Sequence, residues 1–461
     1  MKKVLLITLL LCSPAFAQSD GWLDTTFGNG TGYVTGPSGF FASAVAVEAD
    51  GGVIVGGSSP GNDFQLVRYL SNGTIDNTFS TQGPAGLLFD FVIQPDGYIV
   101  TGGQDQFGNF LLARFYEQGG YSDSSFGNDG IVQGPQGFCS ALVQQTDESI
   151  VAGGADANGN FLVIRYTYYG IVDVQFETGP QGFIEDLVIQ DNGQVVACGV
   201  DLYGFFSIVR YNTDGSIDTT FGDNGIVTGP QGIATSLVIQ SDGYIVVAGY
   251  NTAPDETYVM YVARYDTDGN LDGTFGSSGI VTGPAAVANG LMLQSDGKLI
   301  VLGTQDLNAF MIRLNSDGSV DSSFGASGMT TTPPGFLYGA ALQANGGIVA
   351  AGLDTTNSNF LVARYTNSAV FTQAELTSPL ISPVGTVTLE GTAPNPSNIF
   401  VFMDGNFIGA TTTDTDGDDT WSFTTAIDSP GMYIFRALSV YSMASLMTVG
   451  TNRVRIYGLP V

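Results

Sequence analysis

The sequence predicts an all-β fold, and two observations carry this prediction. Short stretches of β-branched and apolar residues recur along most of the 461-residue chain, separated by Gly-containing turns and without a helical period. One motif also recurs every 45 to 54 residues: an Arg ends such a stretch, a Gly turn follows, and then comes Asp-x-x-Phe. A period of this length is typical of repeat arrays. The motif residues are Arg68, Arg114, Arg165, Arg210, Arg264, Arg313 and Arg364, and Asp24, Asp76, Asp123, Asp173, Asp218, Asp272 and Asp321.

Each repeat contains four predicted strands, as the unit that ends at Phe275 illustrates. Its strands are predicted at 226–228, 235–240, 244–249 and 258–265. A tight hairpin is expected at Asp242-Gly243, because Gly tolerates the positive φ of such turns, and Gly229-Pro230 is expected to end the first strand. Short strands at even spacing without helices favour radially arranged antiparallel sheets. Seven such units predict a seven-bladed β-propeller of four-stranded blades.

The two ends of the repeat array are complementary. The first Asp-x-x-Phe segment, Asp24 to Phe27, has no Arg strand before it, and the last Arg strand, 359–365, has no Asp-x-x-Phe segment after it. A propeller whose ends do not meet leaves exposed strand edges. We therefore expect the N-terminal strand to pair antiparallel with 360–365 and to place Asp24 near Arg364.

The repeat resembles a known family in its motif. Asp242-Gly243, the segment IVVAG at 245–249, Ala263-Arg264-Tyr265 and the Asp-x-x-Phe-Gly that begins at Asp272 resemble the bacterial delta-60 repeat. The resemblance covers roughly residues 20–366 and implies a β-propeller, but the family has no agreed activity. This chain departs from the pattern in its repeat length, nearer 50 residues, and in a recurrent Gly-Pro-x-Gly.

The N-terminus has the features of an export signal. Lys2 and Lys3 precede the apolar run 4–11, and Ala15-Phe16-Ala17 provides a small-x-small cleavage site. We expect cleavage after Ala17 and export to the periplasm, the outer surface or the extracellular space. The expected organisation is a signal peptide at 1–17, the propeller at 18–370 and a second domain at 371–461, with no transmembrane segment.

The second domain is predicted to be a β-sandwich. Its short strands are separated by turns over a length that fits such a domain. Gly391-Thr392-Ala393, Asp404-Gly405 and Trp421-Ser422-Phe423 resemble bacterial Ig-like domains. The resemblance implies a spacer or adhesive module.

Composition narrows the possible functions. The formal net charge is −30, which argues against nucleic acid or an anionic membrane as a partner and is in keeping with solubility or with a cationic partner. The chain contains no histidine, which excludes Ser-His-Asp and Cys-His catalysis and His-ligated metal sites. Cys139 and Cys198 fall at different repeat positions, so we expect two buried free thiols rather than a disulfide.

The recurrent arginines are interpreted as structural. Each is expected to form a buried or half-buried ion pair with its Asp, while the Phe fills the gap between blades. A ring of arginines that binds an anion is the alternative, and the position of each Arg on the third strand argues against it.

The candidate ligand-binding face contains the variable loops between the second and third strands of each unit. Variable loops on a rigid scaffold usually determine specificity. An acidic or amide residue follows the closing Gly in several units, and aromatic residues lie nearby; the alternative role for these acidic and amide residues is to close each loop as an Asx-turn. The candidates are Asp105, Phe107, Asp156, Asp201, Tyr203, Asn251, Tyr258 and Asp354.

Calcium is the alternative ligand that the acidic turns suggest. Asp266, Asp268 and Asp272 carry oxygen ligands at alternating positions, and the segment 414–419 is similarly acidic. An EF-type loop needs a longer run with a terminal Glu, and turn chemistry accounts for the pattern. We therefore predict no cofactor and no metal site.

Asp90 and Asp186 suggest the alternative of an enzyme. They share one position on the innermost strand, where a carboxylate pair facing a channel would suit a carbohydrate-active hydrolase or lyase. No aromatic or basic subsite accompanies them. The favoured interpretation is an exported, non-enzymatic binding or scaffold propeller whose ligand is a protein or glycan at the cell surface; a purely structural envelope component is a third possibility.

Overall fold

The computed structural model describes most of the repeat region. It covers residues 20–367 apart from 39–40, 49, 80, 82, 253–256, 344–345 and 357–358, and beyond these the backbone of the strands between 375 and 457. The expected signal peptide and the acidic segment 414–419 lie outside the described residues. Among the described residues, none forms a helix long and apolar enough to span a bilayer.

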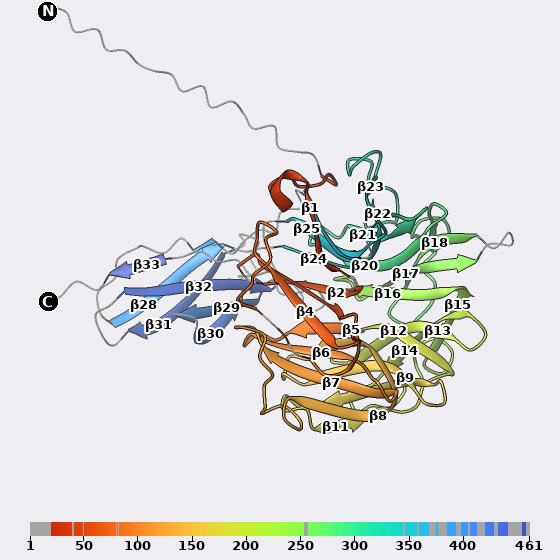
Figure 1. Ribbon diagram of the computed structural model, residues 1–461, viewed down its shortest axis with the longest axis horizontal. Helices are drawn as coiled ribbons and strands as arrows, with labels where there is room; N and C mark the ends of the chain where they lie inside the picture. Colours follow the sequence, from red (N-terminus) through yellow and green to blue (C-terminus); the bar gives the residue numbers. More distant parts are fainter. Residues whose placement is uncertain are drawn as a thin grey trace, which may run out of the picture.

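The repeat region is built from antiparallel sheets that surround a common centre (Figure 1). One short 3-10 helix, η1 (Gly28–Gly30), precedes them. The first sheet contains β2 (Phe41–Val47), β3 (Val53–Ser58) and β4 (Phe64–Tyr69). The next contains β5 (Gly86–Ile93), β6 (Tyr98–Asp105), β7 (Asn109–Tyr116), β8 (Ile131–Gln144), β9 (Ile150–Asp156), β10 (Phe161–Tyr166) and β11 (Val172–Gln175).

Four further sheets complete the ring. They are β12 (Gly182–Ile189), β13 (Val195–Asp201), β14 (Phe205–Tyr211) with β15 (Ile226–Gln231); β16 (Ile233–Ile239), β17 (Ile245–Thr252), β18 (Tyr258–Tyr265) with β19 (Ile280–Thr282); β20 (Val287–Leu293), β21 (Leu299–Gln305), β22 (Asn308–Leu314) with β23 (Met329–Pro334); and β24 (Phe336–Leu342), β25 (Ile348–Asp354), β26 (Asn359–Tyr365) with β1 (Tyr33–Ser38). Each repeated unit of three or four antiparallel strands is called a blade below; the seven-stranded sheet contains two blades joined through β8.

Gly229-Pro230 does not end its strand, contrary to the sequence prediction, whereas β19 does end directly before the equivalent Gly283-Pro284. β15 continues through Gly229-Pro230 to Gln231, and β8 continues through Gly134-Pro135. The first half of β8 pairs with β7 and its second half pairs with β9. The outer strand of one blade therefore continues directly into the inner strand of the next.

The Gly of this Gly-Pro is required because the next blade packs against it. A Cβ on Gly179 would lie 2.6 Å from the hydroxyl oxygen of Tyr211, and a Cβ on Gly36 would lie 2.5 Å from that of Tyr69. These tyrosines follow the repeat arginines, and their rings are buried between blades. The Gly-Pro is thus part of the contact between neighbouring blades.

A β-bulge interrupts the inner strand of each blade. In β12, Ile184 pairs with Gly199 and Asp186 pairs with Cys198, which leaves Glu185 as the extra residue. The bulge brings the carbonyl oxygen of Phe183 to 2.0 Å from where a Cβ on Gly199 would be, so only Gly fits there. The corresponding bulged residues of the other blades are Ser43, Phe89, Ser140, Thr235, Asn289 and Tyr338.

Each repeat Arg pairs with the Asp that follows it in the motif, except Arg364, which pairs with Asp24 from the start of the array. The closest N–O distances are between 2.6 and 2.8 Å in all of these pairs. The second carboxylate oxygen accepts hydrogen bonds from a Ser or Thr two residues later, as from Thr220 to Asp218. Burial alone would raise the pKa of Asp218. Hydrogen bonds from Thr220, Gln194 and Arg210 outweigh this effect and lower the pKa to about 2.

The Arg165 unit lacks part of this arrangement. Gln175 stands where the other motifs have Ser or Thr, and the segment forms strand β11 instead of a turn. The Asp173 side chain is 43% exposed, whereas that of Asp218 is 9% exposed. The guanidinium group of Arg210 also lies 4.5 Å from the centre of the Phe221 ring, a cation–π contact.

The same guanidinium groups also bind the next blade. Nη1 of Arg114 donates to the backbone carbonyl of Tyr168 at 2.6 Å, and Nη1 of Arg264 donates to that of Ser316 at 2.7 Å. Arg364 of the last blade donates to the carbonyl of Ser71 in the first blade at 2.6 Å. Each of these side chains therefore connects the turn of its own blade to the turn of its neighbour.

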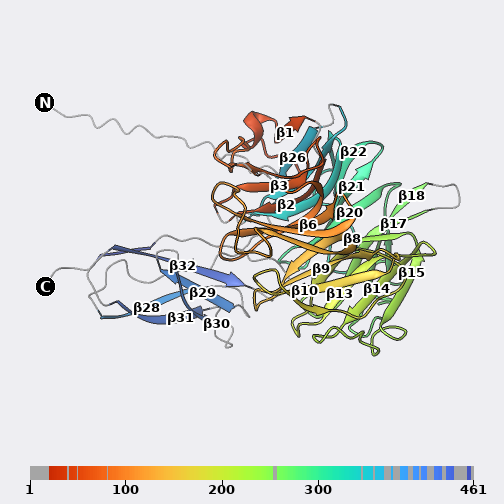
Figure 2. The same ribbon diagram turned by 60° about the horizontal axis from the view of Figure 1, so that its bottom comes forward.

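The ends of the array meet as the sequence predicts. β1 pairs antiparallel with β26, and Figure 2 shows the two strands side by side. Nε of Arg364 donates to Asp24 at 2.8 Å. Nη1 of Arg313 donates hydrogen bonds to residues at both ends of the array, to Oδ2 of Asp20 at 2.7 Å and to Oδ1 of Asn367 at 2.9 Å. Closure therefore uses ion pairs in addition to the strand ladder.

The hydrophobic core lies between neighbouring blades. Cys198 packs with Phe206, Leu237 and Val247 from two adjacent blades. Cys139 lies in the equivalent cluster of another pair of blades. Both thiols are buried and free, as predicted.

The segment after the ring contains two antiparallel sheets. One joins β27 (Glu375–Leu376), β28 (Gly385–Thr392) and β31 (Thr420–Ile427), and the other follows the order β30 (Asn406–Thr412), β29 (Asn398–Met403), β32 (Met432–Val440) and β33 (Val454–Tyr457).

Arg210→Ala should lower the free energy of unfolding by about 3–5 kcal/mol, because it leaves the carboxylate of Asp218 buried without its partner. Arg165→Ala provides a matched control, since the exposed carboxylate of Asp173 is solvated and its loss should be about 1 kcal/mol. Urea denaturation of both variants measures the difference, and equal losses would contradict this account.

Removal of residues 18–36 should greatly lower stability and cause aggregation, because it exposes the edge of β26 and removes Asp24 from Arg364 and Asp20 from Arg313. Thermal unfolding and size-exclusion chromatography report these two effects. An unchanged unfolding midpoint would show that closure contributes little.

Candidate functional site

The variable loops follow the second strand of each blade, on the face opposite the Asp-Gly hairpins. The predicted site residues lie in these loops or at the strand ends that border them. Asp105 ends β6 and Asp156 ends β9, while Asp201 and Asp354 end β13 and β25. The fold therefore brings the predicted residues to one face, although they come from separate blades.

The predicted carboxylates close their own loops. Oδ1 of Asp105 accepts hydrogen bonds from the backbone N–H groups of Phe107 and Asn109 at 2.8 and 2.9 Å. Asp156 binds the N–H groups of Asn158 and Asn160 in the same way. Burial alone would raise the pKa of Asp105, but hydrogen bonds from Asn109 outweigh this effect and lower the pKa. These carboxylates stay ionised and hold the loop backbone, which is the Asx-turn role.

The remaining polar candidates divide into two kinds. Asp201 accepts from the N–H groups of Tyr203 and Phe205, both at 2.9 Å, and Asp354 accepts from that of Thr356 at 2.8 Å. In contrast, Oδ1 of Asn251 is buried without a hydrogen-bond partner.

The aromatic candidates point into solvent. Phe107 is 72% exposed, Tyr203 is 77% exposed and Tyr258 is 52% exposed. Tyr258 packs edge-to-face on Tyr250, with 5.1 Å between ring centres. Leu202 and Leu307 are exposed on the same set of loops. Large apolar side chains are thus presented by loops whose backbone is held by the carboxylates.

An apolar collar, which the sequence analysis missed, lies inside these loops. It consists of residues near the start of six of the inner strands: Leu87, Phe138, Phe183, Ile233, Val287 and Phe336. Phe183 pairs with Val200 and Phe138 pairs with Ala155, and each of these partners directly precedes the Asp that closes its loop. The Phe138 and Phe183 rings are 6.2 Å apart across two blades. The signal was the large apolar residue that follows Gly-Pro-x-Gly in most units.

Asp90 and Asp186 are each bound to a neighbouring blade. Oδ2 of Asp90 accepts from the N–H of Leu142 at 2.7 Å, and Oδ2 of Asp186 accepts from Ser236 Oγ at 2.9 Å and from the N–H of Leu237 at 3.0 Å. Burial raises the pKa of Asp90 to about 7, with a contribution from the charge of Asp186. Burial likewise raises the pKa of Asp186 to about 6.

Glu185 is a third carboxylate in this region. It is the bulged residue of β12, and burial raises its pKa to about 7, assisted by the charge of Asp186. The sequence analysis did not identify it, although alignment of the repeats places it level with Ser140 and Thr235. Within the described part of the chain, no group of three acidic or thiol side chains is arranged to hold a metal ion.

Asp266 and Asp268, considered as calcium ligands, lie in a turn. Oδ1 of Asp266 accepts from the N–H groups of Asp268 and Asn270 at 2.9 and 2.8 Å. Its carboxylate therefore has the same loop-closing role as Asp105.

Known proteins show the same architecture. Four segments, 48–79, 190–221, 240–275 and 294–324, match the family model described as "Domain of unknown function (DUF5122) beta-propeller". The repeats are propeller repeats. A chain in the crystal structure of the mitotic checkpoint complex is similar to this propeller at TM-score 0.51 and 11% identity, covering 79% of this chain and 98% of that one.

Two further structures align with lower scores. The Pan2 WD40 domain of Neurospora crassa aligns at TM-score 0.48 and 14% identity, covering 74% of this chain and 97% of its own. Virginiamycin B lyase of Staphylococcus aureus aligns at 0.45 and 14%, covering 72% and 98%. Among curated proteins, none matches the chain in sequence.

The carboxylates of Asp90, Glu185 and Asp186 should make the propeller less stable as the pH rises from 4 to 7. The unfolded chain releases these protons near pH 4, whereas the folded state holds them until about pH 6 to 7, so stability falls between these values and is constant above them. Glu185→Gln should reduce the fall by about 2 kcal/mol. Thermal unfolding of both proteins at pH 4.5 and 8 measures this fall in stability. An equal fall in the variant and the original protein would contradict the assignment to Glu185.

Proposed function

We propose that this chain is an exported binding or scaffold protein whose variable face recognises a protein or glycan. In this proposal, residues 1–17 are removed as a signal peptide and residues 18–370 form a seven-bladed propeller. Residues 371–461 form an Ig-like module that spaces or anchors the propeller at the cell surface. The propeller acts by binding, without catalysis.

The observation that carries the proposal is the exposure of aromatic side chains on the variable loops. Phe107, Tyr203 and Tyr258 come from different blades, and each exposes more than half of its surface. Tyr and other aromatic side chains supply much of the binding energy at interfaces, because they bury a large area at low entropic cost. Exposed apolar groups on a rigid support are typical of recognition surfaces.

The closed ring supports a binding role because it holds the loops in place before a ligand arrives. Asp105 and Asp201 fix the backbone beside Phe107 and Tyr203. Binding then orders few additional groups, which lowers its entropic cost. The collar of Phe138 and Phe183 extends the apolar surface toward the centre.

The combined variant Phe107→Ser, Tyr203→Ser and Tyr258→Ser should abolish ligand binding and leave the melting temperature within about 2 °C of the original, because these side chains are exposed. The mature protein is screened on glycan and peptide arrays, and the positive probes are then titrated with the variant.

Tyr121→Ser with Tyr169→Ser is the matched control, since these side chains are 69% and 57% exposed on the connections of the opposite face. It should retain binding. If the control loses binding and the triple variant keeps it, the assigned face is wrong.

A further inference from the structure

The bulged residues of the inner strands join neighbouring blades at the centre of the ring. Four of their side chains donate a hydrogen bond to a backbone carbonyl of the next blade. These pairs are Ser43 with Leu88, Ser140 with Ile184, Thr235 with Ala288 and Asn289 with Leu337. Each acceptor directly precedes the bulged residue of its own strand, so the contacts follow one another from blade to blade.

Glu185 holds the same position in β12 and is the charged residue of this set. An ionised carboxylate only accepts hydrogen bonds, so it cannot donate as Ser140 does. The carbonyl of Ala234, the equivalent acceptor in the next blade, accepts instead from the thiol of Cys198 at 3.7 Å, a weak donor. Glu185 is half-buried, so solvent still reaches it. The contact between these two blades therefore presents two oxygen acceptors, the carboxylate of Glu185 and the carbonyl of Ala234.

The neighbours of Glu185 disfavour its negative charge. Burial, assisted by the charge of Asp186, raises its pKa to about 7. Its other titratable neighbours are Cys198 on β13 and Tyr250 on β17; burial raises the pKa of both groups, and the charge of Glu185 contributes. None of these neighbours is a cation, so a positive charge brought to Glu185 would favour its ionised form.

Aromatic rings of the collar lie beside this carboxylate. Phe183 precedes Glu185 by two residues, and Phe138 precedes Ser140 by two residues on β8. The two rings are 6.2 Å apart. Along β12, Phe183 therefore lies between the variable loop and Glu185.

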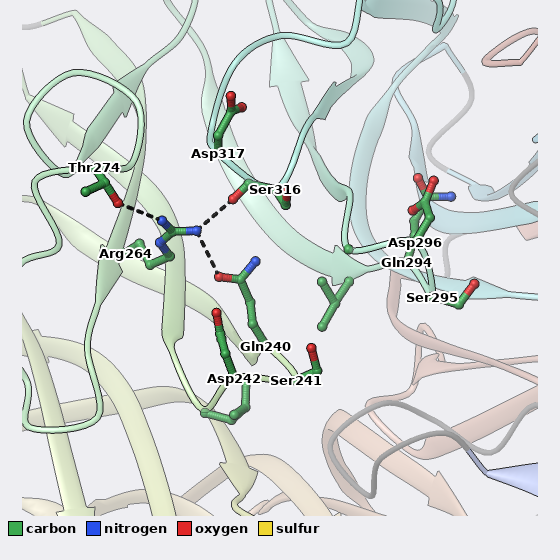
Figure 3. A pocket seen from close by; sticks show the side chains of 13 residues that line it. Gln240, Ser241, Asp242, Arg264, Thr274, Gln294, Ser295, Asp296, Ser316 and Asp317 are labelled. Carbon is green, nitrogen blue, oxygen red and sulfur yellow. Dashed lines mark hydrogen bonds between the residues drawn. The ribbon is translucent and has the colours of Figure 1, made fainter. Parts of the chain in front are cut away.

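The repeat arginines show how this propeller holds a guanidinium group. Arg264 binds the carboxylate of Asp272 at 2.6 Å and lies 4.9 Å from the centre of the Phe275 ring. It also donates to the carbonyl of Ser316 at 2.7 Å, a contact that Figure 3 shows. A carboxylate, a carbonyl and an aromatic ring thus surround the group.

The same three kinds of group occur at the centre of the ring, as Glu185, the carbonyl of Ala234 and Phe183. The described basic side chains are engaged elsewhere, the repeat arginines with their Asp partners and Lys298 with Asp321 at 2.9 Å. A guanidinium group from another molecule would complete this set, and the formal charge of −30 attracts such a ligand. A guanidinium group suits the set better than an ammonium group, because it is planar, stacks on aromatic rings and is less strongly hydrated.

We propose that an arginine side chain of a protein ligand enters the centre of the propeller from the variable face and binds Glu185. Its guanidinium group pairs with the carboxylate of Glu185, donates to the carbonyl of Ala234 and lies against the ring of Phe183. This inference rests on the function proposed above, since it names the ligand of the same face as a protein segment rather than a glycan.

Isothermal titration calorimetry of the mature protein with a capped leucine–arginine–leucine tripeptide tests the proposal. The same tripeptide with citrulline, an uncharged analogue of arginine with nearly the same shape, should bind about tenfold more weakly because it loses the charged pair. The lysine tripeptide should bind about threefold more weakly, since an ammonium group is more strongly hydrated and has no planar fork.

The pH dependence of this titration reports on Glu185 directly. Binding requires the ionised carboxylate, so at pH 6 the arginine tripeptide should release about one proton, and at pH 8.5 almost none. Its affinity should rise about tenfold between these values, because the ionised fraction of Glu185 rises by this factor. Titrations in buffers of different ionisation enthalpy measure the released proton.

Glu185→Gln is the decisive variant. At pH 8.5 it should lower the affinity for the arginine tripeptide about tenfold, to that of the citrulline tripeptide, and at pH 6 it should abolish proton release. Glu148→Gln is the matched control, since it removes the same charge from an exposed position in the hairpin between β8 and β9, and it should keep the affinity within about twofold. Phe183→Leu should weaken the arginine tripeptide about threefold, because the aromatic face is lost.

Three results would overturn the proposal. They are equal affinity for the arginine and citrulline tripeptides, unchanged affinity in Glu185→Gln, and a titration in which the arginine tripeptide does not saturate a site. The triple variant of Phe107, Tyr203 and Tyr258 tests the function separately. If array ligands bind Glu185→Gln normally but fail to bind the triple variant, the variable face is the binding face and the arginine site is wrong.

Discussion

The structure depends on a guanidinium group that makes two kinds of contact at once. In each repeat, Nε binds the Asp of the same blade, and Nη1 usually binds a backbone carbonyl of the next blade, as Arg114 does with Asp123 and Tyr168. A planar fork with several donors can do this, whereas a lysine ammonium group could not match the geometry. Burial between blades strengthens these contacts and makes the loss of one partner costly.

This arrangement separates stability from recognition. The hairpin face and the Arg–Asp connections are nearly the same in every repeat, while the opposite loops differ and present Phe107, Tyr203 and Tyr258 to solvent. Because the ring is held by the inter-blade contacts, these loops are free to vary without loss of the fold. The pattern is broken at Arg313, whose Nη1 binds Asp20 and Asn367 at the two ends of the array.

Much of the fold could be predicted because the same local sequence pattern occurs in every repeat. Repetition revealed the strands, the Arg–Asp partners and the complementary ends, and the closure of β1 on β26 followed from that asymmetry. The two thiols were predicted to be free because Cys139 and Cys198 occupy different repeat positions. Gly229-Pro230 was misjudged as a strand end. Proline on an outer strand can sit at an irregularity of the ladder, so β15 continues through a register shift to Gln231.

The sequence by itself determined the repeat, its strands, its charge and the partners of its arginines, because these depend on residues close together in the chain or on a pattern that repeats. Only the tertiary structure decided which side chains meet across blades. The ring contact between Phe138 and Phe183 and the hydrogen bonds from Ser236 and Leu237 to Asp186 join residues about a repeat apart. Their cause is the packing of one blade on the next, which no local pattern of residues encodes.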